Sequence, residues 1–523
     1  MADAKENGGT APAPPAPVPP VVARIAKIAL ADYRAFPAGW AEQFDLGAEG
    51  KNLLLYGENG SGKTSLFRAL KDLMSSFPSE SEFAPLRHIY APGEDGFVSV
   101  QLTAGTPNEF RWEYGEKHPR ETGGHPYSNF SERCRFLDYK ALLETNFVHR
   151  EPTPNLFSVL VGDKDSSGIL CDLPVLVDGK SERLGVLYRR MLAAPKGDRL
   201  GRRKHERTLK ACKDFSDALA NHLPEVVSEC QGVIGRLSTE GLKFDLKPSV
   251  VSYKDKKFIG REIRLEVNLY DKPITQPQMF LNEARLTALA LAIYLGAAKL
   301  VLKPSPADKS VPTRLLVLDD VLIGLDLSNR LPVLRLLEEV FSDWQIILMT
   351  YDRVWYELAK EFTEHSGRWM ALNLREVPTV PGQPGRPHVD SCPDLLAVAE
   401  KHMRDSDLMA TAVYVRAAFE NRLKNVCRDH GIKINYKPDI KDIKADHLWT
   451  GITDRQKGRK ADGKPDFIDP ALMADIETVR STVLNRLSHS SVPSLVTKEV
   501  QFALDTVKKF RDHKFKDLKH AGP

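Results

Sequence analysis

The sequence contains few cysteines, no long apolar run and almost no net charge. Its six cysteines form no CxxC pair, which argues against a zinc ribbon or a disulfide framework and fits a reducing cytoplasm. The most apolar stretch, 286–302, contains a lysine and a glycine, so we expect no membrane span. We also expect no secretory signal, because no basic start precedes an apolar stretch. The net charge of +4 does not by itself indicate nucleic-acid binding.

The length of 523 residues, with 42% apolar residues, allows several domains with buried cores. Residues 1–20 hold many prolines and few apolar side chains, which predicts a disordered tail. From 21 to 375, short apolar runs alternate with helical patterns, which favours an α/β fold. Prolines predict a linker over 376–392, and the helical periodicity of 393–523 predicts an all-α C-terminal domain.

Individual elements of the α/β part can be placed from their patterns. Short apolar runs, typical of parallel strands buried on both faces, lie at 52–56, 315–318 and 345–349. Alternating, β-like segments lie at 95–115, 133–140 and 243–271. Helical spacing predicts helices over 66–74 and 283–302. Two further helices, predicted over 181–194 and 207–237, would form a short arm inserted at 181–240.

A phosphate-binding loop is the strongest motif in the chain. Residues 57–65 read GENGSGKTS and match GxxxxGK[ST] between a predicted strand and a predicted helix. Glycines let backbone N–H groups converge on phosphate oxygens, and the helix N-terminus adds positive potential. We expect Lys63 to reach the β- and γ-phosphates and Thr64 to ligate Mg²⁺. The predicted nucleotide contacts are Asn59, Gly60, Ser61, Gly62, Lys63, Thr64 and Ser65.

Two adjacent carboxylates end a predicted core strand. Asp319 and Asp320 follow the run 315–318, and ligand chemistry in open α/β sheets lies at the C-terminal ends of strands. We predict that Asp319 holds Mg²⁺ with Thr64, and that Asp320 orients or deprotonates an attacking water. The alternative is a solvated turn.

Four segments in this order resemble a known family. They read YGENGSGKTSL, FLNEARLTALALAIYLG, VLDDVLIGLD and IILMTYD. Over residues 21–375 the chain resembles the ABC-type ATPase head of the SMC/RecF class, including its compact relatives in bacterial antiphage systems such as Septu. The resemblance implies ATP and Mg²⁺ as cofactors. It also implies a mixed sheet with an antiparallel subdomain and a short helical arm.

In that family, two heads sandwich two ATP molecules, and each ATP also contacts a signature segment of the partner head. The matching positions here are 281–285. Asn282 could donate to the γ-phosphate, and Arg285 could supply positive charge. Glu283 stands where the family has a glycine, which puts close backbone approach in doubt. The alternative is that 283–302 is only a core helix. Asp326 matches the aspartate that reaches the partner head.

Two positions depart from the family pattern. Asp320 replaces the usual catalytic glutamate, and Tyr351 replaces a histidine that follows the next strand. Tyrosine cannot shuttle protons near neutral pH as histidine can, so we expect slow or partner-activated hydrolysis. After the antiparallel segments, Asp138 or Tyr139 could face Mg²⁺ or water, or could simply end a strand.

Basic residues cluster near the predicted arm. This cluster could contact nucleic-acid phosphates, or it could be a solvated helix face. Its members are Arg189, Arg190, Lys196, Arg199, Arg202, Arg203, Lys204, Arg207 and Lys210. In the C-terminal part, 485–489 has a faint similarity to HEPN ribonucleases. The Arg486-to-His489 spacing does not match theirs, so we expect a structural histidine at a helix end and a domain that docks a partner or mediates assembly.

Three functions are compatible with these patterns. The first is an ATPase switch, in which ATP and Mg²⁺ bring two or more copies together to control an effector such as a nuclease in antiphage defence. The defence role rests on the resemblance alone. The second is a DNA-repair ATPase that contacts DNA through 189–210. The third is a scaffold that holds ATP without useful turnover.

Overall fold

In this computed structural model the chain divides into two compact units, Met1–Ser391 and Cys392–Pro523. The described residues are 23–76, 82–90, 93–103, 109–118, 120–121, 130, 132–146, 155–162, 168–193, 202–237, 240–255, 257–302, 314–379, 384–391, 395–434, 444–484 and 495–515.

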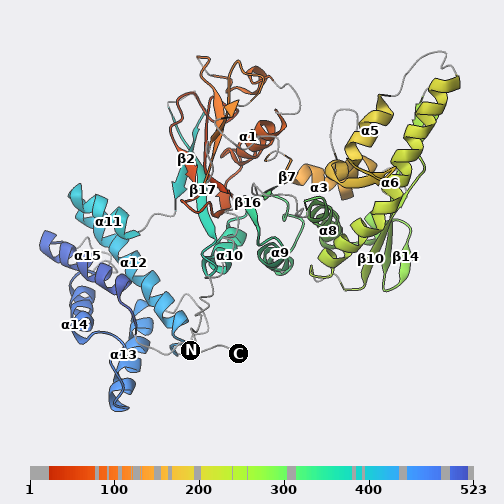
Figure 1. Cartoon of the computed structure of the whole chain (residues 1–523). Helices are drawn as coiled ribbons and strands as arrows, with labels where there is room; N and C mark the ends of the chain where they lie inside the picture. Colours follow the sequence, from red (N-terminus) through yellow and green to blue (C-terminus); the bar gives the residue numbers. More distant parts are fainter. Residues whose placement is uncertain are drawn as a thin grey trace, which may run out of the picture. The chain divides into compact units, whose positions relative to one another are not determined.

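A six-stranded sheet forms the centre of the first unit (Figure 1). Its order is β18-β17-β3-β16-β15-β7; β18 runs antiparallel to β17, and the other neighbours are parallel. The strands are β3 (Asn52–Gly57), β7 (Cys134–Asp138), β15 (Arg314–Asp319), β16 (Trp344–Thr350), β17 (Trp369–Val377) and β18 (Arg386–Ser391). β3, β15 and β16 are buried along nearly their whole length, which explains their unbroken apolar sequences.

Two hydrophobic cores lie on opposite faces of this sheet. Leu53 and Leu55 of β3 join one core, whereas Leu54 joins the other, because successive side chains of a strand point to opposite faces. The first core contains α1 (Lys63–Ser75) and an antiparallel sheet of order β2-β1-β4-β5-β6. That sheet consists of β1 (Ile25–Ala31), β2 (Gln43–Asp45), β4 (Phe97–Leu102), β5 (Glu109–Glu113) and β6 (Arg120–Glu121), and the short helix η1 (Ala84–Leu86) packs beside it.

The second core contains three long helices and the arm. α8 (Glu283–Val301), α9 (Leu327–Val340) and α10 (Arg353–Glu364) contribute most of its helical side chains. Among the helices that the structure describes, α8 alone has the length and apolarity to cross a membrane, but 78% of the tested window is buried inside the protein. A helix this deeply buried in the protein has the environment of a core helix.

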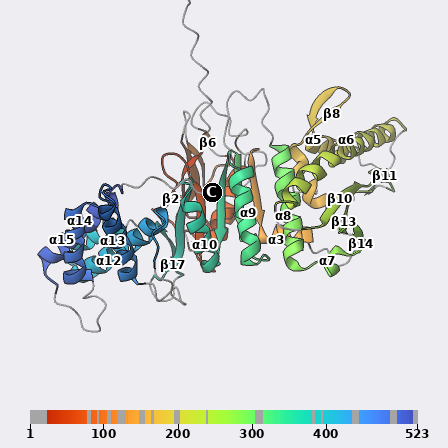
Figure 2. The same ribbon diagram turned by 90° about the horizontal axis from the view of Figure 1, so that it is seen from below.

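The arm combines helices with small antiparallel sheets. Figures 1 and 2 both show α6 alongside α8 and next to β10. The elements of the arm are α3 (Tyr139–Asn146), α4 (Phe157–Leu160), η2 (Ile169–Asp172), β8 (Pro174–Val177), β9 (Lys180–Arg183), α5 (Leu184–Leu192), α6 (Arg202–Ile234), β10 (Leu242–Pro248), β11 (Ser252–Lys254), β12 (Lys257–Ile259), β13 (Ile263–Leu269), β14 (Lys272–Ile274) and α7 (Pro277–Phe280). The arm extends beyond the predicted insertion at 181–240, from α3 to α7. A Cβ atom on Gly296 of α8 would lie 2.5 Å from the Cα atom of Cys230 in α6, so the absence of a side chain permits this close helix contact.

The predicted bounds of the arm helices were partly wrong. The helix predicted from Ser181 begins at Leu184, because 180–183 pairs with β8 as β9. The two residues between these strands, Asp178 and Gly179, both have positive φ, as a type I′ hairpin turn requires. The second helix begins five residues before the predicted Arg207, at Arg202.

The range 376–392, predicted to be a linker, holds strand structure instead. β17 runs to Val377, and β18 pairs with it from Arg386 to Ser391. Because β18 is at the edge of the sheet, Pro387 removes no hydrogen bond from a central strand. Residues 380–383 and 392 are outside the described ranges.

The second unit is built from helices throughout its described residues. Its core surrounds Phe419, Trp449 and Phe510, whose ring centroids lie 5.7–6.3 Å apart. The helices are α11 (Leu395–Arg404), α12 (Leu408–Asp429), α13 (Ala445–Ala461), α14 (Pro470–Val479), the π-helical turn η4 (Arg480–Leu484) and α15 (Thr497–Asp512). The predicted fold class, α/β with a helical C-terminal part, is therefore confirmed.

Candidate nucleotide site

The loop 57–62 joins β3 to α1 and has the backbone that its glycines predict. Gly60 and Gly62 have φ values of +89° and +106°, a region that side chains rarely adopt. A Cβ atom on Gly57 would collide with Ser61 Oγ. Asn59 and Gly60 are exposed at the tip, and Ser65 is half-buried in the first turn of α1. The first N–H groups of a helix have no partner within it, so they are available to an anion here.

Lys63 is buried beneath this loop. Its ammonium donates hydrogen bonds to the carbonyl oxygens of Gly57 at 2.6 Å and Glu58 at 3.2 Å. Burial lowers the pKa of Lys63, while Asp320 and Asp319 act to raise it. The ammonium of Lys63 is thus held by loop carbonyls and lies within range of the charges of two carboxylates.

Asp319 ends β15 beside the start of α1. The hydroxyl of Thr64 donates to Asp319 Oδ2 at 3.0 Å. Burial, and then the charge of Asp320, raises the pKa of Asp319 to about 6, against the opposing effects of Thr64 and Lys63. Within the described residues, Ser61 Oγ and Asp319 Oδ1 are buried without a hydrogen-bond partner. These orphaned oxygens fit a phosphate and a Mg²⁺ ion, which prefers oxygen ligands.

Asp320 is held toward the same site in a left-handed backbone conformation, with φ of +55°. Its N–H donates to the Met349 carbonyl at 3.1 Å, and its Oδ1 accepts from the Tyr351 N–H at 2.9 Å. Burial raises the pKa of Asp320, although Lys63 and the Tyr351 N–H lower it. Tyr351 therefore orients Asp320 through its backbone N–H, and the residue as a whole is 40% exposed.

Asp138 stands beside Asp319 on the neighbouring strand end. Its carboxylate accepts from Arg68 Nη2 at 2.9 Å and from the Ala141 N–H at 2.8 Å. Both oxygens are thus occupied by protein donors. This arrangement favours a strand-end and helix-cap role for Asp138 over a metal ligand. Within the described ranges, no hydrogen bond joins Tyr139 to Asp319 or Asp320.

The predicted signature residues and Asp326 form a separate group. Asn282 caps α8 by accepting the Arg285 N–H at 3.0 Å. Asn282 and Arg285 line a small cavity of about 110 Å³ with Leu325 of the turn before α9, whereas Glu283 and Asp326 are exposed. Among the described residues, no hydrogen bond or ion pair joins any of these four to the 57–65 loop. The predicted role of these residues toward a partner copy stays a prediction.

Part of the basic cluster can be located. Arg189 and Arg190 are exposed on α5, and Arg207 and Lys210 on α6. Two of these four are paired, Arg190 with Glu182 at 2.8 Å and Lys210 with Asp178 at 3.7 Å. Lys196 and Arg199 fall outside the described ranges, as do the side chains of Arg202, Arg203 and Lys204.

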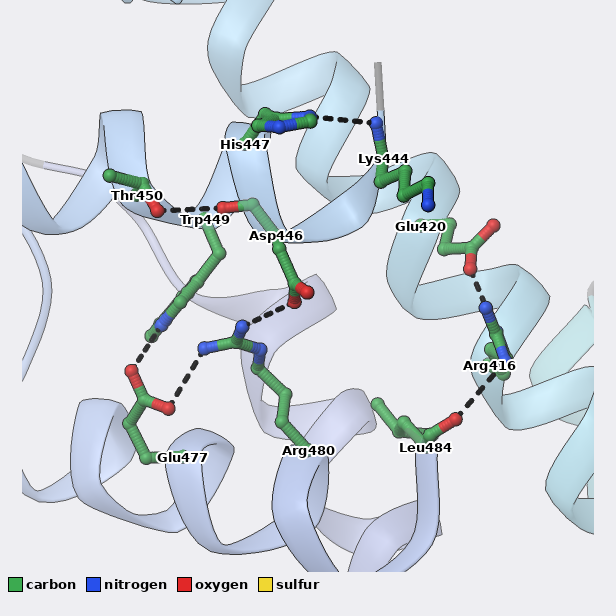
Figure 3. Close-up of polar contacts among 10 residues, drawn as sticks. All are labelled: Arg416, Glu420, Lys444, Asp446, His447, Trp449, Thr450, Glu477, Arg480 and Leu484. Carbon is green, nitrogen blue, oxygen red and sulfur yellow. Dashed lines mark hydrogen bonds and ion pairs between the residues drawn. The ribbon is translucent and has the colours of Figure 1, made fainter. Parts of the chain in front are cut away.

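A polar network ties three elements of the second unit together (Figure 3). Arg480 pairs with Asp446 at 2.6 Å and Glu477 at 2.8 Å, and its guanidinium lies 5.6 Å from the centroid of the Trp449 ring. Separately, Arg416 binds Glu420 and the Leu484 carbonyl. These arginines therefore join helices of the unit. Asn485, Arg486 and His489 are outside the described ranges.

Two neighbours of the loop carry no sequence signal that we recognised. A Cβ atom on Gly62 would lie 3.3 Å from Pro387 of β18 and 3.5 Å from Phe36. Trp40 fixes this wall by donating its indole N–H to the Pro387 carbonyl at 2.8 Å. Pro387 falls in the range predicted to be a linker, and only the tertiary pairing of β18 brings it here.

No protein-family model matches the chain, and no curated protein is similar to it. Several solved structures are similar in fold. The SMC head domain from Thermotoga maritima is 14% identical, with a TM-score of 0.33, and the match covers 71% of this chain and 99% of that one. A second match is the Smc head with an extended coiled coil bound to the C-terminal domain of ScpA, from Pyrococcus furiosus. It is 12% identical, with a TM-score of 0.39, and the match covers 73% of this chain and 99% of that one. The recombination mediator RecF with ATP is 15% identical, with a TM-score of 0.39, and the match covers 64% of this chain and 93% of that one. These matches agree with the predicted resemblance at the level of the fold and carry no argument about activity.

Proposed function

We propose that this chain binds ATP with Mg²⁺ between the 57–65 loop and the ends of β15 and β16, and that it hydrolyses the ATP. The observation that carries this proposal is the pair of buried, unpartnered oxygens, Ser61 Oγ and Asp319 Oδ1. They lie beside a buried lysine and a Thr64–Asp319 hydrogen bond. Burying unpaired polar atoms costs free energy, so the protein alone leaves this site incomplete.

The side chains have separate roles in this proposal. Thr64 and Asp319 hold Mg²⁺, which when bound neutralises phosphate charge, and Lys63 contacts the β- and γ-phosphates. Asp320 accepts a proton from the attacking water or orients it, which its raised pKa and its hydrogen bond to Tyr351 support. Tyr351 stands where the resembled family has a histidine, and we therefore propose that turnover is slow or activated by a partner.

A second copy of the chain completes the site in this proposal. In the described part of the chain, no hydrogen bond or ion pair joins Asn282, Arg285 or Asp326 to the loop of the same copy, which supports a role across a dimer interface. The output would be a nucleotide-driven assembly, dimeric or larger, in the cytoplasm that controls an effector such as a nuclease in antiphage defence. The resemblance stated above is the sole support for the effector and the defence role.

DNA or RNA binding through the arm is a second candidate function. It is favoured by Arg189 and Arg207, which are exposed and have no ion-pair partner in the described part of the arm. If this candidate holds, binding of a fluorescent duplex weakens steeply as salt increases, and the double substitution Arg189→Ala with Arg207→Ala weakens it further.

Light scattering and phosphate release test the main proposal. The native chain should gain mass with ATP and Mg²⁺ and release phosphate. Asp320→Asn should keep the mass change and lose most phosphate release, whereas Lys63→Ala should lose both. Asp343→Asn, an exposed carboxylate paired with Arg314 at the opposite end of the sheet, should behave like the native chain. ATP binding without phosphate release in the native chain would favour the scaffold, and no ATP binding would refute the proposal.

A further inference from the structure

Arg330 of α9 is a buried arginine next to the candidate site. Its side chain is 10% exposed, and its guanidinium lies 5.9 Å from the centroid of the Trp355 ring. Nε donates to the Leu325 carbonyl at 2.7 Å and Nη2 to the Ile323 carbonyl at 3.5 Å. These two carbonyls belong to the turn that connects Asp320 to Asp326. One side of the guanidinium therefore fixes the shape of this turn.

The other side of the guanidinium binds the loop after β16. Nη1 donates to Asp352 Oδ2 at 2.6 Å. Asp352 also caps α10, because its Oδ1 accepts the Trp355 N–H at 3.1 Å. Burial acts to raise the pKa of Asp352, but this N–H and Arg330 outweigh it and hold the pKa below its usual value. The carboxylate thus remains charged and anchored to both groups.

A second link joins the same two segments. Asp320 Oδ1 accepts the N–H of Tyr351, the residue before Asp352. The backbone N–H of Arg330 also donates to the Asp326 carbonyl at 3.1 Å, while the Asp326 carboxylate stays exposed and makes no cap bond. Two links therefore join the 320–326 turn to the 351–352 loop. One is the bond from the Tyr351 N–H to Asp320, and the other runs through Arg330 to Asp352.

We propose that Arg330 is a positioning residue that holds the 320–326 turn and the 351–352 loop at one fixed separation. Asp320, Tyr351 and Asp326 then move as one unit. In this proposal Arg330 acts only through the residues that it holds. A lysine cannot replace it, because a single ammonium lacks the planar fork that binds two carbonyls on one side and a carboxylate on the other. An effect of Arg330 on the rate of ATP hydrolysis rests on the proposed function. Its effect on the relative position of the 320–326 turn and the 351–352 loop does not.

The first test uses nucleotide-free protein and local hydrogen exchange. Arg330→Lys should speed amide exchange in 323–326 and 351–353 by about tenfold or more, a loss of about 1.4 kcal/mol of local protection. The matched control is Arg314→Lys. Arg314 is also buried, pairs with Asp343 at 2.6 Å and lies 6.0 Å from a tryptophan ring centroid, but it is at the other end of β15. The control should leave both segments unchanged, and equal exchange in all three proteins would overturn the proposal.

The second test separates kcat from KM for ATP. Arg330→Lys should lower kcat by about tenfold or more with KM changed less than about threefold, because small displacements of reacting groups cost large factors in rate. Asp352→Asn keeps the cap oxygen and weakens the same link, so it should act in the same direction, and the double variant should lose little more. Melting curves should show that both variants are folded at the assay temperature. A change in KM alone, or additive losses, would overturn the proposal. If the native chain binds no ATP, the proposed function fails, and the exchange experiment still decides the role of Arg330.

Discussion

Replacing Asp319 by asparagine should stabilise the protein in the absence of metal and nucleotide. Asp319 is 4% exposed, and burial together with the charge of Asp320 raises the pKa of its carboxyl from 3.8 to about 6. The folded state therefore holds the proton more tightly than the unfolded state. Between about pH 4 and pH 6 the unfolded chain releases this proton first, so the stability of the native protein falls as the pH rises through this window.

The magnitude follows from the size of the shift. A rise of about two pKa units corresponds to about 3 kcal/mol of stability lost above pH 6. Asparagine has the same shape, carries no charge and can still accept the hydrogen bond from Thr64. We therefore expect Asp319→Asn to raise the free energy of unfolding by about 2–3 kcal/mol at pH 7.5 and by little at pH 4.

Calorimetry or urea unfolding in EDTA, at pH 7.5 and at pH 4, measures the difference in unfolding free energy between Asp319→Asn and the native chain. The transition to follow is that of the first unit. Asp138→Asn is the matched control, since Asp138 ends the neighbouring strand but is satisfied by Arg68 and a backbone N–H. That variant should be less stable than the native chain. In the presence of ATP and Mg²⁺, Asp319→Asn should instead be less stable than the native chain, because it loses a metal ligand. A destabilised Asp319→Asn variant in EDTA at pH 7.5 would refute the electrostatic reasoning.

Three further predictions concern other parts of the chain. Gly62→Ala forces a side chain into a φ of +106°, so it should lower stability by about 1–2 kcal/mol and weaken ATP binding in a calorimetric titration. Gly296→Ala should lower the melting temperature through an overpacking cost of about 1–3 kcal/mol, because its Cβ would meet the α6 backbone. Gly232→Ala, with open space at its Cβ, should cost nothing or stabilise α6. Arg480→Ala breaks two ion pairs of a nearly buried guanidinium and should destabilise the second unit by about 1–3 kcal/mol in urea unfolding, whereas Lys457→Ala, whose pair is exposed, should change it by less than about 0.5 kcal/mol.

The candidate site was predictable where its chemistry is local in sequence. The 57–65 loop needs a fixed glycine spacing, and the acidic pair needs only an apolar strand before it, so both could be recognised from the chain. Arg330 gave no such signal, because one arginine in an amphipathic helix has the pattern of a solvated residue. The hairpin at 178–179 did carry a signal, the Asp-Gly pair, which we did not use.

The sequence by itself determined which segments are buried strands, where the phosphate loop bends and which carboxylates follow a core strand. These properties depend on side-chain periodicity and on backbone freedom within a few residues. Only the tertiary structure decided that Pro387 walls the loop, that Arg68 occupies Asp138, and that Arg330 joins two loops. Pro387 and Arg68 contact residues far away in the chain, whereas the partners of Arg330 lie 5, 7 and 22 residues away, before and after its helix. In each case sheet order and packing select the partner, which no local pattern encodes.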